Sequence, residues 1–496
     1  EKTKILIAPI SSPDENHPLA KEKLSPVLAY FVVNSKQQGF DYANKMLELG
    51  GLGHSAVIHT GDMKIADEYG VAMRVGRIIV NSPSSQGAIG DIYNTNTPSL
   101  TLGCGSYGKN SVSQNVTTVN LINKKRIAKR RVNMQWFKVP PRIYFEEDSI
   151  QYLEKMEGIS RAFIVTDPMM VKLGNVDKVL YYLRKREEYC HSEIYSDVES
   201  DPSVECIMRG VKAMNAFQPD VIIAIGGGSP IDAAKAMWVF YEYPEESFDN
   251  IIQPFSFPEL RQKAHFCAIS STSGTATEVT AFSVITDYAK GIKYPLADFN
   301  ITPDVAIVDP ELTYTMPAKL CAHTGMDALT HCMEAYVSTF ASMFTDANAL
   351  HGIREIVEWL PKSYAGDHEA RQHMHEAQCI AGIAFSSGLL GIVHSMAHKT
   401  GAAFENGHII HGAANAMYLG KVIQWNSKDP RAAERYAYVA KEILHLPGET
   451  NEELIAALVQ KIRDLNDQLN IPQSIKDYAN GGVKVDAENP QMVSEE

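Results

Sequence analysis

Four histidines lie within eighteen residues, among glycine, alanine and apolar side chains: His394, His398, His408 and His411. Residues four apart on a helix share one face, with Cβ atoms about 5–6 Å apart. His394 and His398 have this spacing, and so do Asp327 and His331. If the two pairs converge, one carboxylate and two or three imidazoles can hold a divalent ion, a ligand set that fits Fe²⁺ or Zn²⁺ without choosing between them. Such an ion would bind an alcohol or carbonyl oxygen. The alternative for each histidine alone is an ordinary core or surface imidazole.

A glycine-rich turn follows the apolar run at 221–225, in the stretch "VIIAIGGGSPIDAAKAM". Gly226, Gly227 and Gly228 allow a ligand to approach the backbone closely. Ser229 is predicted to cap the following helix, with Pro230 at its first position, where a missing N–H costs nothing. The free N–H groups and the positive end of the helix dipole favour an anion. We therefore predict a phosphate or pyrophosphate site; a tight structural turn is the alternative.

A second turn, "SSTSGTATEVT" at 270–280, is rich in hydroxyl groups. Ser271, Thr272 and Thr275 can donate to phosphate or ribose, although helix capping explains them equally well. Two such turns in one sheet strengthen the ligand interpretation, because ligands of these folds bind beyond the carboxyl ends of the strands. Asp167 ends another strand and can accept from a ribose hydroxyl. A carboxylate there would repel a 2′-phosphate and favour NAD over NADP, unless Asp167 is only a solvated turn residue.

The elements that must position these residues fall into three zones. Residues 1–110 hold strand-like runs broken by glycine turns, and residues 111–138 are predicted to be a linker. Residues 139–316 alternate apolar strands (161–167, 220–229, 265–275 and 303–310) with helices such as 176–189, which predicts a parallel sheet covered on both faces. Residues 317–480 have helical periodicity, clearest at 318–337, and predict an all-α domain. Residues 481–496 are predicted to be a frayed tail.

Composition excludes several functions. A net charge of −13 disfavours nucleic acid as the main partner. The sequence contains no apolar run near the roughly 20 residues that span a bilayer, so no membrane partner is expected. The seven cysteines are scattered, odd in number and free of CxxC pairs, which is typical of a reducing cytoplasm. We expect a cytoplasmic protein with a small-molecule substrate.

The motifs "GGGSPIDAAK", "STSGTATEVT", "GMDALTHCMEAYVS" and "GLLGIVHSMAHKTGAAF" with "HGAANA" resemble those of the iron-containing (group III) alcohol dehydrogenases. The resemblance covers residues 139–480 and implies a dehydroquinate synthase-like fold. It implies that the metal ligands are Asp327, His331, His394 and a fourth histidine. Motif context favours His411 for that fourth ligand, whereas the family's spacing favours His408; we predict His411. His398 then lies near the substrate, where it can relay a proton.

The same resemblance implies the cofactor contacts. Residues 226–229 and Asp232 lie around the pyrophosphate and nicotinamide of NAD, and Asp167 meets the adenosine ribose. The residues that further line the cofactor are Ser271, Thr272, Thr280 and Lys293. The implied reaction is reversible hydride transfer between NADH and a small aldehyde, acetaldehyde giving ethanol, with Fe²⁺ (or Zn²⁺) bound to the enzyme.

The first zone is similar to the last part of a CoA-acylating aldehyde dehydrogenase domain, through "GGLGHSAVIHT", "SSQGAIGDIYN" and "PSLTLGCGSYGKNSVSQNV". This order of domains resembles the fermentative bifunctional aldehyde–alcohol dehydrogenases, and implies a homo-oligomer and a helical filament for the full-length protein. In that family the thioester-forming cysteine precedes the part matched here, so we predict that the chain reduces aldehydes without the acylating step. The alternatives are a metal-dependent polyol dehydrogenase acting on glycerol or propanediol, and a filament assembly module. A metal hydrolase is disfavoured because it needs no dinucleotide site.

Overall fold

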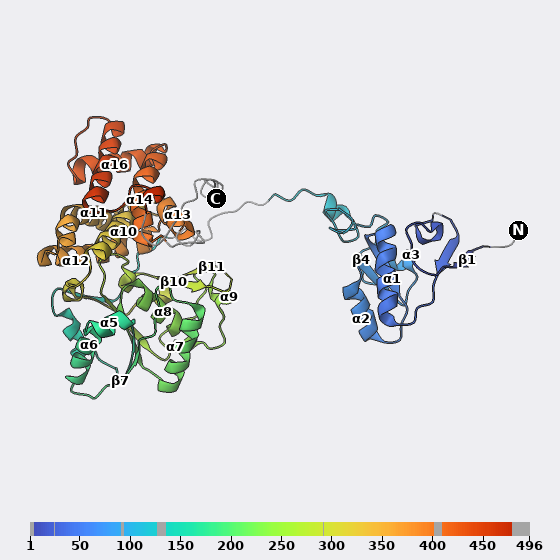
Figure 1. Ribbon diagram of the computed structural model, residues 1–496, viewed down its shortest axis with the longest axis horizontal. Coiled ribbons are helices and arrows are strands. Elements are labelled where there is room, and N and C mark those ends of the chain that lie inside the picture. The colour runs from blue at the N-terminus through green and yellow to red at the C-terminus, as the bar shows by residue number, and fades with distance from the viewer. Residues whose placement is uncertain are drawn as a thin grey trace. The chain divides into compact units, whose positions relative to one another are not determined.

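The computed structural model describes residues 4–23, 25–90, 94–125, 135–290, 292–400 and 409–478. The chain divides into two compact units, Glu1–Arg131 and Val132–Glu496, which are drawn in Figure 1. The predicted tail at 481–496 lies outside the described residues.

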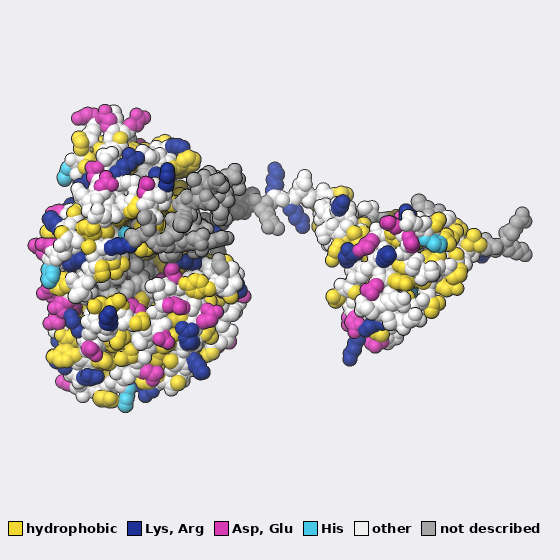
Figure 2. Space-filling model, viewed as in Figure 1, with side chains coloured by type: hydrophobic (Ala, Val, Ile, Leu, Met, Phe, Trp, Pro, Cys, Tyr) yellow, Lys and Arg dark blue, Asp and Glu magenta, His cyan; other side chains and the backbone are white. Residues whose placement is uncertain are grey.

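The first unit is a small α/β structure with two parallel strand pairs. Its elements are β1 (Leu6–Pro9) paired with β2 (Val27–Tyr30), β3 (Gly53–Ile58) paired with β4 (Val75–Val80), and helices α1 (Lys36–Leu49), α2 (Met63–Ala72) and α3 (Ser84–Ile89). Its main core cluster centres on only three buried side chains, Phe40, Tyr69 and Met73. Leu6 and Ile7 of β1 are 59% and 62% exposed, and Figure 2 shows many hydrophobic side chains on this unit's surface.

The predicted linker at 111–138 makes contacts near both of its ends. Asn115 is buried and donates to the carbonyls of Ala88 and Thr97 in the first unit. Near the other end, Trp136 packs edge-on against Phe255 and Phe299 of the second unit. Sequence patterning missed both contacts because each depends on a single side chain rather than on a periodic run.

A six-stranded parallel sheet forms the centre of the second unit, in the order β5-β12-β9-β8-β6-β7. Its strands are β5 (Arg142–Phe145), β6 (Arg161–Val165), β7 (His191–Tyr195), β8 (Val221–Gly226), β9 (His265–Ser270) and β12 (Val305–Val308). Every residue of β8 is buried, which is typical of a central strand covered on both faces. The predicted parallel sheet is confirmed.

Helices cover both faces of this sheet. One face packs against α7 (Val204–Phe217) and α8 (Gly228–Glu242), and the other packs against α4 (Tyr152–Lys155) and α6 (Asn175–Arg184). Figure 1 shows α6 and α7 on opposite sides. The remaining elements of this part are α5 (Pro168–Lys172), α9 (Phe248–Ile251) and the antiparallel hairpin of β10 (Phe282–Asp287) and β11 (Ile292–Ala297).

Residues 318–468 form the predicted helical part. Its helices are α10 (Ala318–Val337), α11 (Met343–Tyr364), α12 (His368–Gly388), α13 (Ile392–Thr400), α14 (His411–Asn426), α15 (Pro430–Tyr438) with a π-helical turn (Val439–Ile443), and α16 (Asn451–Gln468). Helix α10 is buried continuously from Cys321 to Tyr336. A helix buried on all sides lies at the centre of a bundle, so its polar side chains need partners inside the protein.

The α/β part and the helical part share one hydrophobic core. Ala276, Val279, Ala306 and Val308 of the α/β part belong to the same buried cluster as α10, α12 and α14. Both parts lie within the single unit that begins at Val132. Residues from the two parts can therefore face one cavity in a fixed arrangement.

Among the described residues, no single helix has the length and apolar composition needed to cross a bilayer. Helices α12 and α13 reach that composition only as a pair, and they are bent by 101° at the break between them.

Candidate active site

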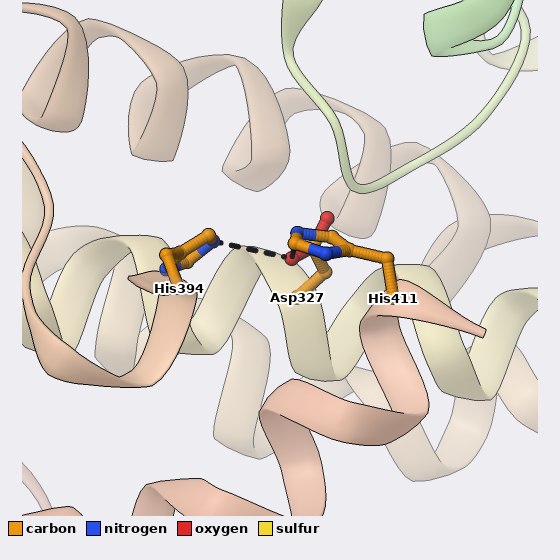
Figure 3. Close-up of side chains that lie close together, drawn as sticks. All are labelled: Asp327, His394 and His411. Atoms are coloured by element: carbon orange, nitrogen blue, oxygen red, sulfur yellow. Dashed lines mark ion pairs between the residues drawn. The ribbon is translucent and has the colours of Figure 1, made fainter. Parts of the chain in front are cut away.

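Three side chains from three helices converge in the helical part: Asp327 of α10, His394 of α13 and His411 at the start of α14. One possible ligand atom from each lies within 4.8 Å of the others. Nε2 of His394 and Nε2 of His411 are each 3.5 Å from Oδ1 of Asp327, as Figure 3 shows. The structure thus brings together three of the four residues predicted as metal ligands.

The fourth predicted ligand, His331, lies beside this group. Its Nε2 is 3.8 Å from Oδ1 of Asp327, in the expected i, i+4 relation. Its ring stacks on His394 at 4.6 Å and on Phe385 at 4.1 Å between centroids. The alternative fourth ligand, His408, lies outside the described residues.

The break between α12 and α13 directs His394 toward α10. Glu334, one turn beyond His331 on α10, accepts from the backbone N–H of Val393 at 2.7 Å and is 2.6 Å from Nδ1 of His394. The carboxylate therefore fixes the first turn of α13 and leaves Nε2 of His394 free to face Asp327. A carboxylate behind a histidine in this way is the usual support of a metal ligand.

The buried amide of Asn415 indicates whether Asp327, His394 and His411 can surround a cation. Nδ2 of Asn415 donates to Oδ1 of Asp327 at 2.6 Å and lies 3.2 Å from Nε2 of both His394 and His411. Three atoms that could coordinate an ion thus all lie within 3.2 Å of one nitrogen. Burial alone would raise the pKa of Asp327. The neighbouring His331, His411 and His394 nevertheless hold this pKa well below its usual range. A carboxylate and imidazoles in this arrangement fit Fe²⁺ or Zn²⁺.

Sequence reasoning missed Glu334 and Asn415, although the same spacing rule would have found them. Glu334 is seven residues after Asp327, and Asn415 is four residues after His411. Both intervals return a side chain to the same helix face. The helix faces that carry the predicted ligands therefore continue to Glu334 and Asn415.

The glycine turn after β8 lies against the hydroxyl-rich turn after β9. A Cβ on Gly227 would lie 3.2 Å from Thr272, and one on Gly228 would lie 3.1 Å from Thr275. Gly226 has a φ of 149°, which a residue with a side chain rarely adopts. Gly226 therefore suits its backbone conformation, whereas Gly227 and Gly228 suit the close packing of the two turns.

The predicted cap at Ser229 is wrong. Helix α8 begins at Gly228 after the N-cap residue Gly227, and no side chain caps it. Ser229 and Pro230 therefore stand inside the first turn. The start of α8 keeps unsatisfied N–H groups that a bound anion can use.

Two buried hydroxyl groups lie near the start of α8. Oγ of Ser271 and Oγ1 of Thr272 have no hydrogen-bond partner within the described part of the chain. Both residues line a cavity with Asp167 and residues 227–230. Buried polar atoms are nearly always paired in folded proteins, so these hydroxyls fit a polar ligand such as a dinucleotide.

Asp167 caps a helix, which neither interpretation of this residue predicted, and it also lines this cavity. Its Oδ1 accepts from the N–H groups of Met169 and Met170 at 2.8 and 3.0 Å, which caps α5. Its position among the cavity-lining residues is compatible with the predicted ribose contact.

A second cavity of about 450 Å³ joins the two sets of residues. Its lining includes Gly228, Ser229, Asp232, Thr280 and Lys293 from the α/β part, and Asp327, His331, His394, His398 and His411 from the helical part. Nζ of Lys293 pairs with Oδ1 of Asp201 at 2.9 Å. The ring centroids of His398 and His411 lie 5.0 Å apart. Burial lowers the pKa of His398 to about 4, and the neighbouring histidines contribute to the same shift.

Asp201, Thr275, Thr277 and Ser283 also line the cavity, and the rest of its wall is apolar. The apolar residues are Phe282, Val284, Pro295, Leu296, Phe385, Leu389, Leu390, Ala397 and Ile409. A small aldehyde or alcohol can place its oxygen at the Asp–His group and its carbon chain against this wall.

Comparison with known proteins matches the second unit to two family models. These are the iron-containing alcohol dehydrogenase model at residues 140–310 and the C-terminal model of the Fe-containing alcohol dehydrogenase family at residues 321–489. The aldehyde-alcohol dehydrogenase of Streptococcus pneumoniae is 47% identical over 96% of the chain, which spans 56% of that relative's length. The NADPH-dependent butanol dehydrogenase of Clostridium saccharobutylicum is 57% identical over 70% of this chain, and the match covers 87% of the butanol dehydrogenase.

Solved structures show the same architecture. The iron-containing alcohol dehydrogenase of Thermococcus thioreducens aligns with a TM-score of 0.61 at 37% identity, over 68% of this chain and 86% of its own. The sulfoacetaldehyde reductase of Bifidobacterium kashiwanohense, solved in complex with NAD⁺, aligns with a TM-score of 0.62 at 25% identity. The alignment covers 69% of this chain and 88% of the reductase.

Proposed function

Because the chain belongs to the iron-containing alcohol dehydrogenase family, we propose that it reduces acetaldehyde to ethanol with NADH, in the reversible reaction acetaldehyde + NADH + H⁺ → ethanol + NAD⁺. It would supply the alcohol dehydrogenase half of a fermentative bifunctional enzyme. One observation carries this proposal: the Asp327–His394–His411 group and the uncapped start of α8 line a single cavity.

Each part of the cavity has a role in this reaction. When bound, a divalent ion supplies a Lewis acid for the substrate oxygen, and the dihydronicotinamide supplies the hydride. Asp327, His331, His394 and His411 would hold the ion, and Glu334 orients His394. The apolar wall excludes water from the reacting carbon. His398 faces the cavity and is placed to exchange the proton of the alcohol.

The cofactor is proposed to be NADH. A carboxylate at Asp167 would repel the 2′-phosphate of NADPH, although a relative named as NADPH-dependent is 57% identical. Asp167→Asn keeps a side-chain oxygen for the helix cap and removes the charge, so it should raise kcat/KM with NADPH relative to NADH. An unchanged ratio of the two kcat/KM values would remove Asp167 from cofactor choice.

The proposed substrates are small aliphatic aldehydes rather than polyols. The apolar part of the wall offers no partner for a second hydroxyl, and burying an unpaired hydroxyl costs about 1–3 kcal/mol. A panel of ethanol, 1-butanol, 1,2-propanediol and glycerol tests this, with higher kcat/KM expected for the two monoalcohols. A preference for glycerol would favour the polyol alternative.

The chain is not expected to perform the acylating step. Supplying acetyl-CoA and NADH should release no CoA, whereas acetaldehyde and NADH should be consumed. We further propose that the protein is a cytoplasmic homo-oligomer, with helical filaments formed by the full-length enzyme. Filaments from a protein that does not bind NADH would instead support the assembly alternative.

Chelation provides the decisive experiment. Acetaldehyde-dependent oxidation of NADH should stop after the protein is treated with a chelator, and should return when Fe²⁺ or Zn²⁺ is restored. Metal analysis of the purified protein identifies the resident ion, for which we propose Fe²⁺. Full activity in a preparation free of metal would overturn the proposal.

A further inference from the structure

A short segment, residues 277–282, forms part of the wall of the cavity that contains the Asp–His group. Thr277, Thr280 and Phe282 of this segment line the cavity. The segment is a 3-10 turn (Thr277–Val279), the connecting residues Thr280 and Ala281, and the first residue of β10. In the ranges that the structure describes, its backbone is paired with the neighbouring part of the chain only near its end, where the carbonyl of Ala281 accepts from Asp298 and Phe282 pairs with Ala297, and side chains from two other helices make further contacts with it.

Lys235 of α8 holds this segment from the sheet side. The side chain is fully buried, and Nζ donates to the carbonyls of Thr277, Thr280 and Phe282 at 2.7, 2.7 and 2.9 Å. An ammonium group has three donor hydrogens, and the segment presents three carbonyls to it. Burial lowers the pKa of Lys235; a lysine is rarely retained in such a place without partners.

Helix α12 holds the same segment from the opposite side. Nε2 of Gln378 donates to Oε1 of Glu278 at 2.6 Å, and the N–H of Ala281 donates to Oγ of Ser386 at 3.1 Å. Helix α12 belongs to the part that carries the histidines, whereas α8 begins with the anion-binding turn. The segment is therefore fixed between the two parts that must be aligned for hydride transfer.

We propose that Lys235 is a positioning residue for hydride transfer. By fixing residues 277–282, it sets the wall that orients the nicotinamide ring toward the substrate, an inference that rests on the proposed function. The three carbonyls that Lys235 contacts lie outside the anion-binding turn at 226–229. Loss of the Lys235 ammonium should therefore disturb the transfer geometry more than the binding of the cofactor, since misplacement by about 1 Å can cost about 100-fold in rate.

Lys235→Met tests this, because methionine keeps most of the volume and removes all three donors. We expect kcat for acetaldehyde reduction to fall by about tenfold or more, while the dissociation constant of NADH and the metal content stay close to those of the wild type. The primary deuterium isotope effect on kcat, measured with NADH deuterated at the transferred position, should rise because hydride transfer becomes slower. A merely destabilised enzyme would lose active molecules without changing the isotope effect.

Lys263→Met is the matched control, since Nζ of Lys263 also donates to a carbonyl, that of Tyr241 at 2.7 Å, but Tyr241, unlike the residues that Lys235 holds, does not line the cavity. It should leave kcat and the isotope effect unchanged. Wild-type kcat and isotope effect in Lys235→Met would overturn the positioning role. If that variant does not fold, Lys235→Gln, which keeps two donor hydrogens, should give an intermediate result; failure of both to fold would assign Lys235 to stability alone. Inactive wild-type enzyme would instead refute the proposed function.

Discussion

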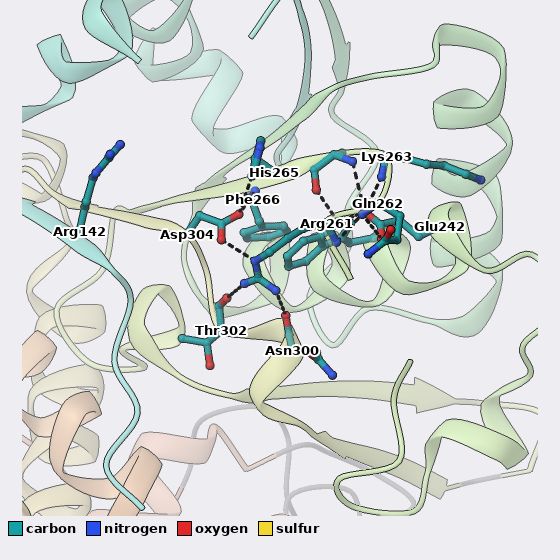
Figure 4. Close-up of polar contacts among 12 residues, drawn as sticks. Arg142, Glu242, Arg261, Gln262, Lys263, His265, Phe266, Asn300, Thr302 and Asp304 are labelled. Atoms are coloured by element: carbon teal, nitrogen blue, oxygen red, sulfur yellow. Dashed lines mark hydrogen bonds and ion pairs between the residues drawn. The ribbon is translucent and has the colours of Figure 1, made fainter. Parts of the chain in front are cut away.

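The two ends of the parallel sheet differ in how far the chain itself pairs their buried polar groups. At the amino ends, the Glu242 carboxylate accepts from the indole of Trp238 at 2.9 Å and from four successive backbone N–H groups, those of residues 261–264. Arg261 donates to Asp304 and to the carbonyls of Asn300 and Thr302, as Figure 4 shows. The chain itself satisfies these groups.

At the carboxyl ends, several polar groups lack such partners. Ser271 and Thr272 keep unpaired hydroxyls, and the start of α8 is uncapped. Both ends contain charged and hydroxyl residues in tight turns, so residue type does not distinguish them. The difference lies in hydrogen bonding. Polar groups that have a partner within the chain stabilise the fold, and polar groups without one are available to bind a ligand.

The largest effect is expected at the metal group. Asp327→Ala and His331→Ala should remove the bound metal and abolish alcohol dehydrogenase activity, because each deletes a predicted ligand, while NADH binding remains near that of the wild type. Metal analysis, turnover and fluorescence titration with NADH measure the three quantities. Unchanged turnover in His331→Ala would exclude that residue from the metal site.

The amino-end network should show the reverse behaviour. Glu242→Ala leaves several buried N–H groups without an acceptor and should lower the free energy of unfolding by about 3 kcal/mol. The metal content and kcat of the molecules that remain folded should not change. Thermal melting combined with activity per folded molecule checks this. A variant that melts normally but loses activity would contradict the assignment of this end to stability.

Glu334→Gln probes the support of His394. The amide is a weaker acceptor for Nδ1–H, so the affinity for the metal should fall by about 10–100-fold. Competition with a chelator of known affinity measures this change directly. Glu355→Gln provides a control, because Glu355 also pairs with a histidine, His373, but lies away from the cavity. Equal metal affinity in both variants would show that His394 needs no such support.

The smallest effect is expected from the unpaired hydroxyls. Ser271→Ala and Thr272→Val each remove one donor predicted for the cofactor and should weaken NADH binding by about 1 kcal/mol. The free energy of unfolding should stay unchanged or increase, because each substitution removes a buried hydroxyl group that has no hydrogen-bond partner. NADH titration and thermal melting test both expectations. A fall in melting temperature with normal NADH binding would mean that the hydroxyls serve the fold.

The sequence by itself determined the local elements and the kind of chemistry. Apolar runs marked the strands β6, β8, β9 and β12, and helical periodicity marked α10 with Asp327 and His331 one turn apart. These features depend on neighbours within a few residues, which a sequence displays directly. The motifs were specific enough to indicate the family over residues 139–480.

Only the tertiary structure decided which side chains meet. Glu334 behind His394, Asn415 among the predicted ligands and Lys235 beneath residues 277–282 each join segments far apart in the chain. The start of α8 at Gly228 likewise depends on how closely the second turn packs against it. Such contacts follow from the packing of whole helices against the sheet, and that packing is not encoded in the spacing of any single stretch.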